Sequence, residues 1–276
     1  MDYKIITKDN GTTHTLINED CLNVYPKDFP HEDFPHMILT DLPFGTTNAK
    51  WDCVLDLEKM WKWMEFYRAA DTPVLLFSQT PFDKVLGASN IKQLKYEWIW
   101  EKTAATGHLN AKKAPMKAHE NVLAFSGEDT LHENLLMFYR KLPVYNPQKT
   151  TGHKPANTYT KHGDDGELYG KVKTGISGGG QTDRYPRDVL KFASDKQKLN
   201  LHSTQKPLEL LRYMIRTYTN EGDIVMDFTA GSMSVAVAAY LEGRNSVCIE
   251  KDTTQYAKSV RWVESCSQDD WYNIGE

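Results

Sequence analysis

Residues 224–250, IVMDFTAGSMSVAVAAYLEGRNSVCIE, form the stretch that decides the fold. The apolar run IVMDF (224–228) predicts a buried strand, TAGS (229–232) a tight loop, and MSVAVAAYLEG a helix that ends at Gly243. SVCIE (246–250) predicts a second strand that ends in an acid. A strand, a crossover helix and another strand are typical of a parallel sheet with helices on its faces.

The loop of this unit has features of a ligand site. Gly231 has no Cβ, so a ligand can approach its backbone closely, and amides at the start of the helix favour a polar or anionic group. Glu250 follows 19 residues later, where a doubly wound fold places an acid on ribose hydroxyls. Because G-x-G-x-x-G is absent, a nucleoside cofactor without pyrophosphate is favoured over a nicotinamide dinucleotide. The other interpretation is a βαβ unit that binds nothing.

The rest of the chain repeats this alternation. Apolar runs predict strands at 36–41, 72–78, 95–102 and 120–126. Helical spacing of apolar residues predicts helices at 56–69 and 208–218. The sequence therefore predicts an α/β fold with a mostly parallel sheet.

A second constellation, Asp41-Leu42-Pro43-Phe44-Gly45, follows the strand at 36–41. Sites in open α/β sheets form where strands end. The Asp41 carboxylate and a backbone carbonyl can each accept one hydrogen of an amine, and the Phe44 ring can stack on a planar group. The segment therefore suits a planar group that carries an amine, although an ordinary turn has a similar composition.

Charge is distributed unevenly along the 276 residues. Residues 140–206 hold 13 Lys and Arg against 6 Asp and Glu, a net charge of +7. The whole chain carries −4, so the remainder carries −11. Such a basic segment can approach a polyanion, and the alternative is a solvated loop region.

Composition narrows the class of protein. The four cysteines form no C-x-x-C pair, so we expect neither a disulfide framework nor a metal site. No apolar run approaches the ~20 residues of a membrane span, and the N-terminus does not resemble a signal peptide. We expect a cytoplasmic protein that does not associate with membranes.

Several segments together resemble the amino-methyltransferases of DNA, which methylate adenine N6 or cytosine N4 with S-adenosylmethionine. Residues 41–44 are similar to the family's catalytic Asp/Asn/Ser-Pro-Pro-aromatic motif, and DFTAGSM (227–233) to its cofactor loop Asp-x-Phe-x-Gly-Ser-Gly. HSTQKP (202–207) is similar to His-Pro-Thr-Gln-Lys-Pro. Further similar segments are NEDCL (18–22), IWEK (99–102) and AHENVL (118–123). The order of the motifs is that of the family's permuted β group.

The resemblance implies a Rossmann-like S-adenosylmethionine methyltransferase fold in three parts. Residues 1–126 would be the catalytic half, 127–200 an inserted target-recognition segment, and 201–276 the cofactor-binding half. The partner would be double-stranded DNA, the chain a monomer or homodimer, and its origin bacterial or phage.

The resemblance also assigns site residues. The catalytic residues would be Asp41, Leu42, Pro43 and Phe44. The cofactor would be bound by Asp20, Cys21, Lys206, Asp227, Phe228, Gly231, Ser232, Glu250 and Lys251. Within that set Asp227 and Gly231 would line the methionine end of the cofactor and Lys206 would lie near its carboxylate, while Glu250 would bind the ribose and Asp20 the adenine amine. DNA contacts are expected from Thr46, Thr47, Trp51, Lys149, Lys154, Lys161, Lys171, Lys173, Arg184 and Arg187.

Three departures from the family pattern bear on these expectations. Leu42 replaces a proline and should loosen the catalytic turn, Met233 replaces a glycine and should crowd the methionine end of the cofactor, and Ser203 replaces a proline. The acid that opens the catalytic motif favours adenine N6 over cytosine N4. A DNA-binding protein that keeps the fold without the chemistry is the remaining alternative.

Overall fold

The computed structural model describes most of the chain. The described residues are 1–28, 34–47, 49, 51–106, 111–113, 115–126, 143–160, 165–166, 170–171, 177–194 and 205–267. The chain divides into two compact units. The first, the main unit, comprises Met1–Asn146 with Asp188–Glu276, and the second, the small unit, comprises Pro147–Arg187.

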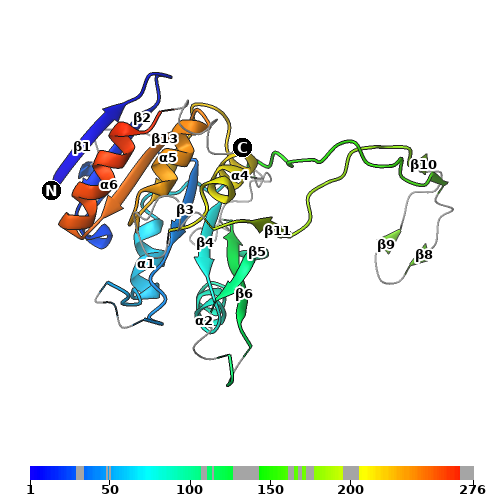
Figure 1. Cartoon of the computed structure of the whole chain (residues 1–276), viewed down its shortest axis with the longest axis horizontal. Coiled ribbons are helices and arrows are strands. Elements are labelled where there is room, and N and C mark those ends of the chain that lie inside the picture. Colours follow the sequence, from blue (N-terminus) through cyan, green and yellow to red (C-terminus); the bar gives the residue numbers. More distant parts are fainter. Residues whose placement is uncertain are drawn as a thin grey trace, which may run out of the picture. The chain divides into compact units, whose positions relative to one another are not determined.

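A nine-stranded sheet forms the centre of the main unit (Figure 1). Its strands are β1 (Asp2–Thr7), β2 (Thr13–Asn18), β3 (Met37–Asp41), β4 (Val74–Ser78), β5 (Leu94–Thr106), β6 (Lys117–Phe125), β11 (Val189–Phe192), β12 (Ile224–Asp227) and β13 (Asn245–Glu250). They lie in the order β1-β2-β13-β12-β3-β4-β6-β5-β11. Pairing is parallel from β2 to β4 and between β5 and β11. It is antiparallel at β1 and on both sides of β6.

Helices cover both faces of this sheet because both faces of its strands are apolar. In β3, Met37 and Leu39 belong to one core cluster, and Ile38 between them belongs to the other. The first cluster includes α4 (Leu208–Tyr218), α5 (Ser234–Leu241) and α6 (Thr253–Ser265), and the second includes α1 (Leu57–Met64) and α2 (Phe82–Ser89). Two short 3₁₀ helices, η1 (Cys21–Asn23) and η2 (Pro26–Asp28), follow β2.

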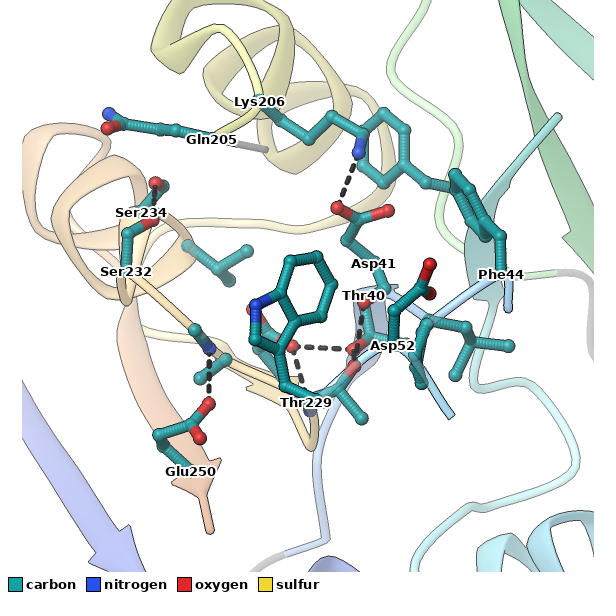
Figure 2. A pocket seen from close by; sticks show the side chains of 18 of the residues that line it. Thr40, Asp41, Phe44, Asp52, Gln205, Lys206, Thr229, Ser232, Ser234 and Glu250 are labelled. Carbon is teal, nitrogen blue, oxygen red and sulfur yellow. Dashed lines mark hydrogen bonds and ion pairs between the residues drawn. The ribbon is translucent and has the colours of Figure 1, made fainter. Parts of the chain in front are cut away.

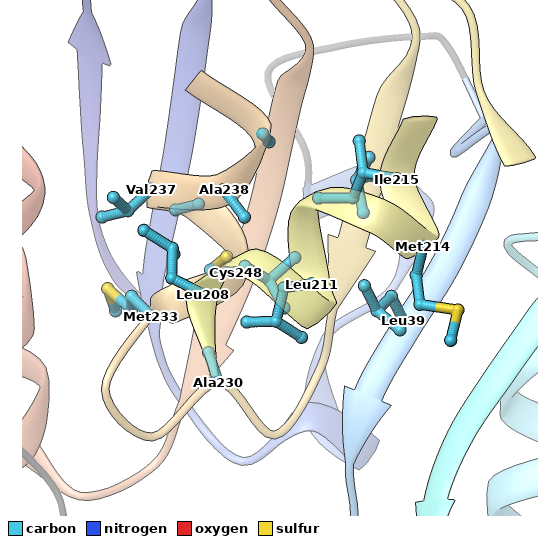
Figure 3. Close-up of a cluster of buried hydrophobic side chains, with 14 of the residues drawn as sticks. Leu39, Leu208, Leu211, Met214, Ile215, Ala230, Met233, Val237, Ala238 and Cys248 are labelled. Atoms are coloured by element: carbon cyan, nitrogen blue, oxygen red, sulfur yellow. The ribbon is translucent and has the colours of Figure 1, made fainter. Parts of the chain in front are cut away.

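Helix α4 shows how sequence spacing becomes packing. Figure 3 shows Leu208 and Leu211 of α4 directed toward the sheet and α5. Both side chains are at most 2% exposed, and Ile215 one turn further on is fully buried. The predicted apolar stripe is therefore the face that packs.

The order of the strands defines the position of the site. From β12 the chain passes through α5 to β13 on one side, whereas from β3 it passes through α1 to β4 on the other. The neighbours β3 and β12 are thus the point where the winding reverses, and their register aligns Met226 with Ile38. Ligands of such sheets bind outside the carboxyl ends of the strands at this point. Asp41 and Asp227 occupy those ends.

The structure confirms the predicted class of fold and extends it. The strands and helices predicted from apolar patterns are all present, with ends shifted by a few residues. Strands β1 and β2 and helices α2 and α6 were not predicted. Strand β11 pairs with β5, so residues 189–192 belong to the main sheet, although they lie within the predicted insertion at 127–200.

The small unit is built from short antiparallel pairs. Strand β7 (Tyr159–Thr160) pairs with β10 (Ser177–Gly178), and β8 (Asp165–Gly166) pairs with β9 (Gly170–Lys171). Gly179 has a φ of +115°, and a Cβ there would lie 2.4 Å from the Asn157 carbonyl oxygen, so only glycine fits. In the described part of the whole chain, no helix has the length and apolarity needed to cross a membrane.

Candidate active site

A cavity of about 860 Å³ lies at the carboxyl ends of β3 and β12 in the main unit (Figure 2). Every predicted catalytic and cofactor residue lines it, as do Thr46, Thr47 and Trp51. Predicted site residues from two distant segments, 20–52 and 206–251, thus line one cavity. Within the described residues, no group of three or more His, Cys, Asp or Glu side chains is placed to hold a metal ion.

Hydrogen bonds join the two strand ends that carry the acids. The Thr40 hydroxyl donates to Asp227 Oδ1 at 2.6 Å. The Thr229 hydroxyl donates to the Asp41 backbone carbonyl at 3.0 Å, and the Thr229 amide donates to Asp227 Oδ1 at 3.2 Å. The predicted cofactor loop is therefore fastened to the strand that ends in Asp41. Nothing in the sequence motifs pointed to Thr40.

Asp227 is buried in this network, and no Lys, Arg or His of the described residues forms an ion pair with it. Burial raises the pKa of its carboxyl to about 7, although the hydrogen bonds from Thr40 and Thr229 act in the opposite direction. The charge of Asp41 adds to the upward shift. Asp227 therefore takes up a proton near neutral pH.

Glu250 holds the loop on the opposite side of the cavity (Figure 2). One carboxylate oxygen accepts the Gly231 amide at 2.8 Å, and the other accepts the Asp252 amide at 2.7 Å. Burial raises the pKa of Glu250, and these two hydrogen bonds counteract the shift. Thus the Gly231 amide is bound by the chain's own acid.

Gly231 itself leaves room for a ligand. Its φ is +46°, in the left-handed region, and a Cβ built there would meet no atom within 4 Å. Since Gly231 lines the cavity, a side chain at this position would enter open space beside the loop.

Met233 does not have the effect predicted from the sequence. We expected it to crowd the cofactor, but it is fully buried in the core cluster of α4 and α5 and does not line the cavity (Figure 3). Its φ of +58° is the left-handed conformation that favours glycine, which accounts for the glycine in the family motif. The substitution therefore changes the core and leaves the cavity open.

Three further candidate residues are held within the structure of the cavity wall. Asp20 accepts the Leu22 amide at 3.1 Å and thereby caps η1, and burial raises the pKa of the adjacent Cys21 thiol to about 12. Phe228 is 1% exposed, and its ring lies 5.2 Å from that of Trp63. These side chains shape the cavity wall.

Lys206 lies on the side of the cavity that carries Asp41. Its ammonium pairs with Asp41 Oδ2 and lies 3.5 Å from Glu120 Oε2. Lys102 in turn contacts Glu120 Oε1 at 2.5 Å. We expected Lys206 near the cofactor carboxylate, and that role stays a prediction. The sequence motifs contained Glu120 and Lys102 without indicating that they would meet Lys206.

Gln205, next in the chain to Lys206, is a buried amide on the cavity wall. It is 3% exposed, and neither its oxygen nor its nitrogen has a hydrogen-bond partner in the described structure. Figure 2 shows it on the side of the cavity that carries Ser232 and Ser234. Because an unsatisfied buried amide is costly, its environment fits a polar ligand group. In the sequence, only the position of Gln205 in the HSTQKP motif indicated that it could belong to the site.

The segment after Phe44 is held by Asp52, which sequence reasoning missed. The Asp52 carboxylate accepts the backbone amides of Gly45, Thr46 and Thr47 at 2.6 to 2.9 Å. Although burial acts to raise the pKa of Asp52, these hydrogen bonds lower it. The anchored loop keeps Trp51 at the cavity with its side chain partly exposed.

The predicted DNA contacts of the basic segment occupy different environments in the small unit. Lys154 and Arg187 are exposed. Lys149 pairs with Asp183 at 2.8 Å, and the Arg184 guanidinium donates to three backbone carbonyls, so both help to shape the unit. Lys171 belongs to β9, whereas Lys161 and Lys173 lie outside the described residues.

Comparison with known proteins identifies the family. Residues 35–261 match the family model for DNA methylases, named for N6 and N4 methyltransferases, and the chain belongs to this family. It is 36% identical over 66 residues to the DNA adenine methyltransferase YhdJ of Escherichia coli (strain K12). That match spans 24% of this chain and 22% of the relative.

Solved structures support the same fold. The complex of M1.HpyAVI with SAM superposes with a TM-score of 0.59 at 17% identity, covering 90% of this chain and 99% of the other. The cytosine-N4-specific PvuII DNA methyltransferase gives a TM-score of 0.59 at 14% identity, covering 95% and 90%. These similarities confirm the Rossmann-like fold predicted from the sequence.

The buried Asp227 carboxyl predicts a specific pH dependence of stability. Its pKa is about 7 in the folded chain against 3.8 in the reference state, so between these values the folded state holds a proton that the unfolded state has lost. The free energy of unfolding therefore falls as pH rises through this window. Asp227→Asn should remove this contribution. As the pH rises from 4.5 to 7, the stability of this variant relative to the wild type should rise by about 3 kcal/mol, at 1.36 kcal/mol per pH unit.

Chemical unfolding of both chains at pH 4.5 to 8 measures this difference. Asp2→Asn, at the exposed start of β1, is the control and should follow the wild type at every pH. A stability difference between Asp227→Asn and the wild type that stays constant with pH would contradict the assignment.

Proposed function

We propose that this chain transfers a methyl group from S-adenosylmethionine to the exocyclic N6 amine of an adenine in double-stranded DNA. One observation carries the proposal. Asp41 with its adjoining aromatic Phe44, and the loop that contains Gly231 and faces Glu250, line the same cavity. This shared cavity supports a role for Asp41 as an amine acceptor beside a loop that would bind the nucleoside cofactor.

The residues around the loop fit the cofactor. Glu250 accepts two backbone amides, and its carboxylate oxygens retain lone pairs for ribose hydroxyls. Gln205 offers a buried amide donor and acceptor without partners in the described structure, which suits the amino-acid end of the cofactor. Gly231 leaves space between them. When bound, S-adenosylmethionine supplies a methyl group activated by a sulfonium.

The catalytic segment would bind and orient the amine. Asp41 would accept one amine hydrogen and the Leu42 carbonyl the other, while Pro43 fixes the direction of that carbonyl. A carboxylate with a usual pKa of about 3.9 is too weak a base to deprotonate a neutral amine beforehand. Asp41 would instead stabilise the positive charge that develops on nitrogen, and the proton would leave during or after transfer.

The aromatic ring would hold the base. Phe44 packs against Phe82 with ring centroids 5.6 Å apart, so the side chain is supported from one side. A base lying on the ring would gain stacking energy. Reaching this position requires the base to leave the duplex, at a cost of a few kcal/mol. Thr46, Thr47 and Trp51 on the cavity wall would contact the DNA around the extruded base.

Adenine is favoured over cytosine on two grounds. The catalytic motif opens with an acid, and the curated relative in E. coli is described as a DNA adenine methyltransferase. The same acceptors could bind the N4 amine of cytosine, and a structural neighbour is cytosine-N4-specific. Digestion of DNA from cells that express the chain, followed by mass spectrometry of nucleosides, tests the choice. N6-methyladenine is expected, and N4-methylcytosine would overturn it.

Removal of the amine acceptor tests the catalytic assignment. Asp41→Ala should lower the rate of methyl transfer at least about a hundredfold, because a preorganised acceptor of developing charge is lost. Lys206 keeps Glu120 as its counter-ion, so the fold and cofactor binding should persist. Asp2→Ala is the matched control. Near-normal turnover of Asp41→Ala in a labelled-methyl assay would refute the mechanism.

A bulky side chain at the loop tests the cofactor assignment. Gly231→Leu should abolish measurable binding of S-adenosylmethionine in calorimetry, because the side chain enters the cavity. Gly222→Leu is the control, since Gly222 also has a positive φ and open space around its Cβ but does not line the cavity. Equal affinity in both variants would exclude the loop as the cofactor site.

Exposed cations of the small unit should bind DNA through phosphates. Lys154→Glu combined with Arg187→Glu should weaken DNA binding and reduce the salt dependence of the affinity by about 0.9 per lost phosphate contact. The control is the double variant Lys59→Glu and Lys62→Glu, which reverses the charge of two exposed lysines of α1. Titration of a fluorescent duplex at several salt concentrations measures both effects. An unchanged salt slope in the Lys154/Arg187 variant would contradict this role.

A further inference from the structure

Four charged side chains of alternating sign form a row beside the catalytic motif. Asp41 is followed by Lys206, then Glu120, then Lys102. The last three are almost buried, with side-chain exposures of 8%, 11% and 10%, whereas Asp41 is 26% exposed. The formal charges of the row sum to zero, and all four residues line the cavity, with Asp41 the most exposed of them.

The first pair conflicts with the proposed chemistry. Lys206 pairs with Asp41 Oδ2 (Figure 2), and because Asp41 Oδ1 is buried, an incoming amine would compete with the ammonium for Oδ2. An ammonium beside this carboxylate also opposes the positive charge that develops on the amine nitrogen. Yet a buried ammonium cannot leave its counter-ion unless another negative charge is close.

Glu120 is placed to resolve this conflict. Its Oε2 atom lies 3.5 Å from Lys206 Nζ, is buried and makes no hydrogen bond in the described structure. Its Oε1 atom is held by Lys102 at 2.5 Å. The carboxylate is therefore fixed in place with one oxygen available to the ammonium.

We propose that Glu120 is a positioning residue that takes over the Lys206 ammonium when a base amine binds Asp41. The inference rests on the proposed methyl transfer. A small movement of Nζ from Asp41 toward Glu120 keeps the buried charge compensated. It also frees Asp41 to accept the amine hydrogen. No covalent bond changes in this exchange.

The ionisation of the row supports the exchange. Burial acts to lower the pKa of Lys206, but Asp41 and Glu120 outweigh it and raise the pKa. Burial likewise acts to raise the pKa of Glu120, but the positive charges of Lys206 and Lys102 outweigh it and lower the pKa. Both groups are therefore charged at neutral pH, as an ion-pair exchange requires.

The sheet holds Glu120 rigidly. Glu120 lies on β6, directly opposite Trp100 of β5. Lys102 also lies on β5, two residues after Trp100. The Lys102 ammonium also lies 5.2 Å from the centre of the Trp100 ring. A purely structural explanation is that the Lys102–Glu120 pair only fastens β5 to β6. That explanation predicts that breaking the pair from either side has the same consequence.

Four variants separate the two explanations. Glu120→Gln removes the second acceptor of Lys206, and Lys102→Met breaks the same ion pair but keeps that acceptor. Glu120→Asp keeps the charge on a shorter side chain. Glu101→Gln is the control, because Glu101 lies on β5 beside Lys102 but pairs with Lys191 outside the cavity.

The measurements are the single-turnover rate of methyl transfer on saturating DNA, the cofactor Kd, and the Tm. Glu120→Gln should lower the rate at least tenfold while the cofactor Kd changes less than threefold. Lys102→Met should lower the Tm as much as Glu120→Gln does. Its single-turnover rate should nevertheless be at least tenfold higher than that of Glu120→Gln. Glu120→Asp should recover part of the rate, and Glu101→Gln should match the wild type.

Two results would overturn the inference while the proposed function stands. One is a Glu120→Gln rate equal to that of the active wild type. The other is an equal loss of rate in Glu120→Gln and Lys102→Met, which would leave the pair as a structural fastening. If the wild type bound cofactor and DNA but transferred no methyl group, the proposed function itself would fail.

Discussion

The parallel pairing of β3 with β12 is the constraint on which the rest of the site depends. These strands are separated by more than 180 residues in the chain, and their register brings Met226 opposite Ile38. Each strand ends in an acid at the same edge of the sheet. The hydroxyls of Thr40 and Thr229 then tie the two ends together. Without this pairing the proposed amine acceptor, Asp41, and the proposed cofactor loop around Gly231 would lie on separate surfaces.

Several acids line the cavity, and three of them, at the ends of β3, β12 and β13, have different environments. Asp41 is paired with the Lys206 ammonium, Glu250 is bound by two backbone amides, and Asp227 is buried with a pKa raised to about 7. Like charges this close together could not all remain ionised without such compensation. Of the three, Asp41 is the acid paired with a side-chain cation, and this pairing is the basis of the proposed exchange with Glu120.

The sequence was most informative where local chemistry determines structure. The apolar run before Asp41 and the strand, loop and helix around Gly231 could be predicted because periodicity and glycine report directly on the backbone. The row from Lys206 to Lys102 could not, because it depends on the antiparallel pairing of β5 with β6 and on the position of α4. Met233 was misjudged because the left-handed turn directs its side chain into the core. Long-range register is the information that a single sequence lacks.

The central claim is that one cavity serves both the cofactor and the amine acceptor. A crystal structure of this chain soaked with S-adenosylmethionine tests it most directly. The account predicts that the ribose lies on Glu250, the amino-acid end lies beside Gln205, and the methyl group faces Asp41. Cofactor bound at another surface, or bound in the cavity with its methyl group directed away from Asp41, would contradict it.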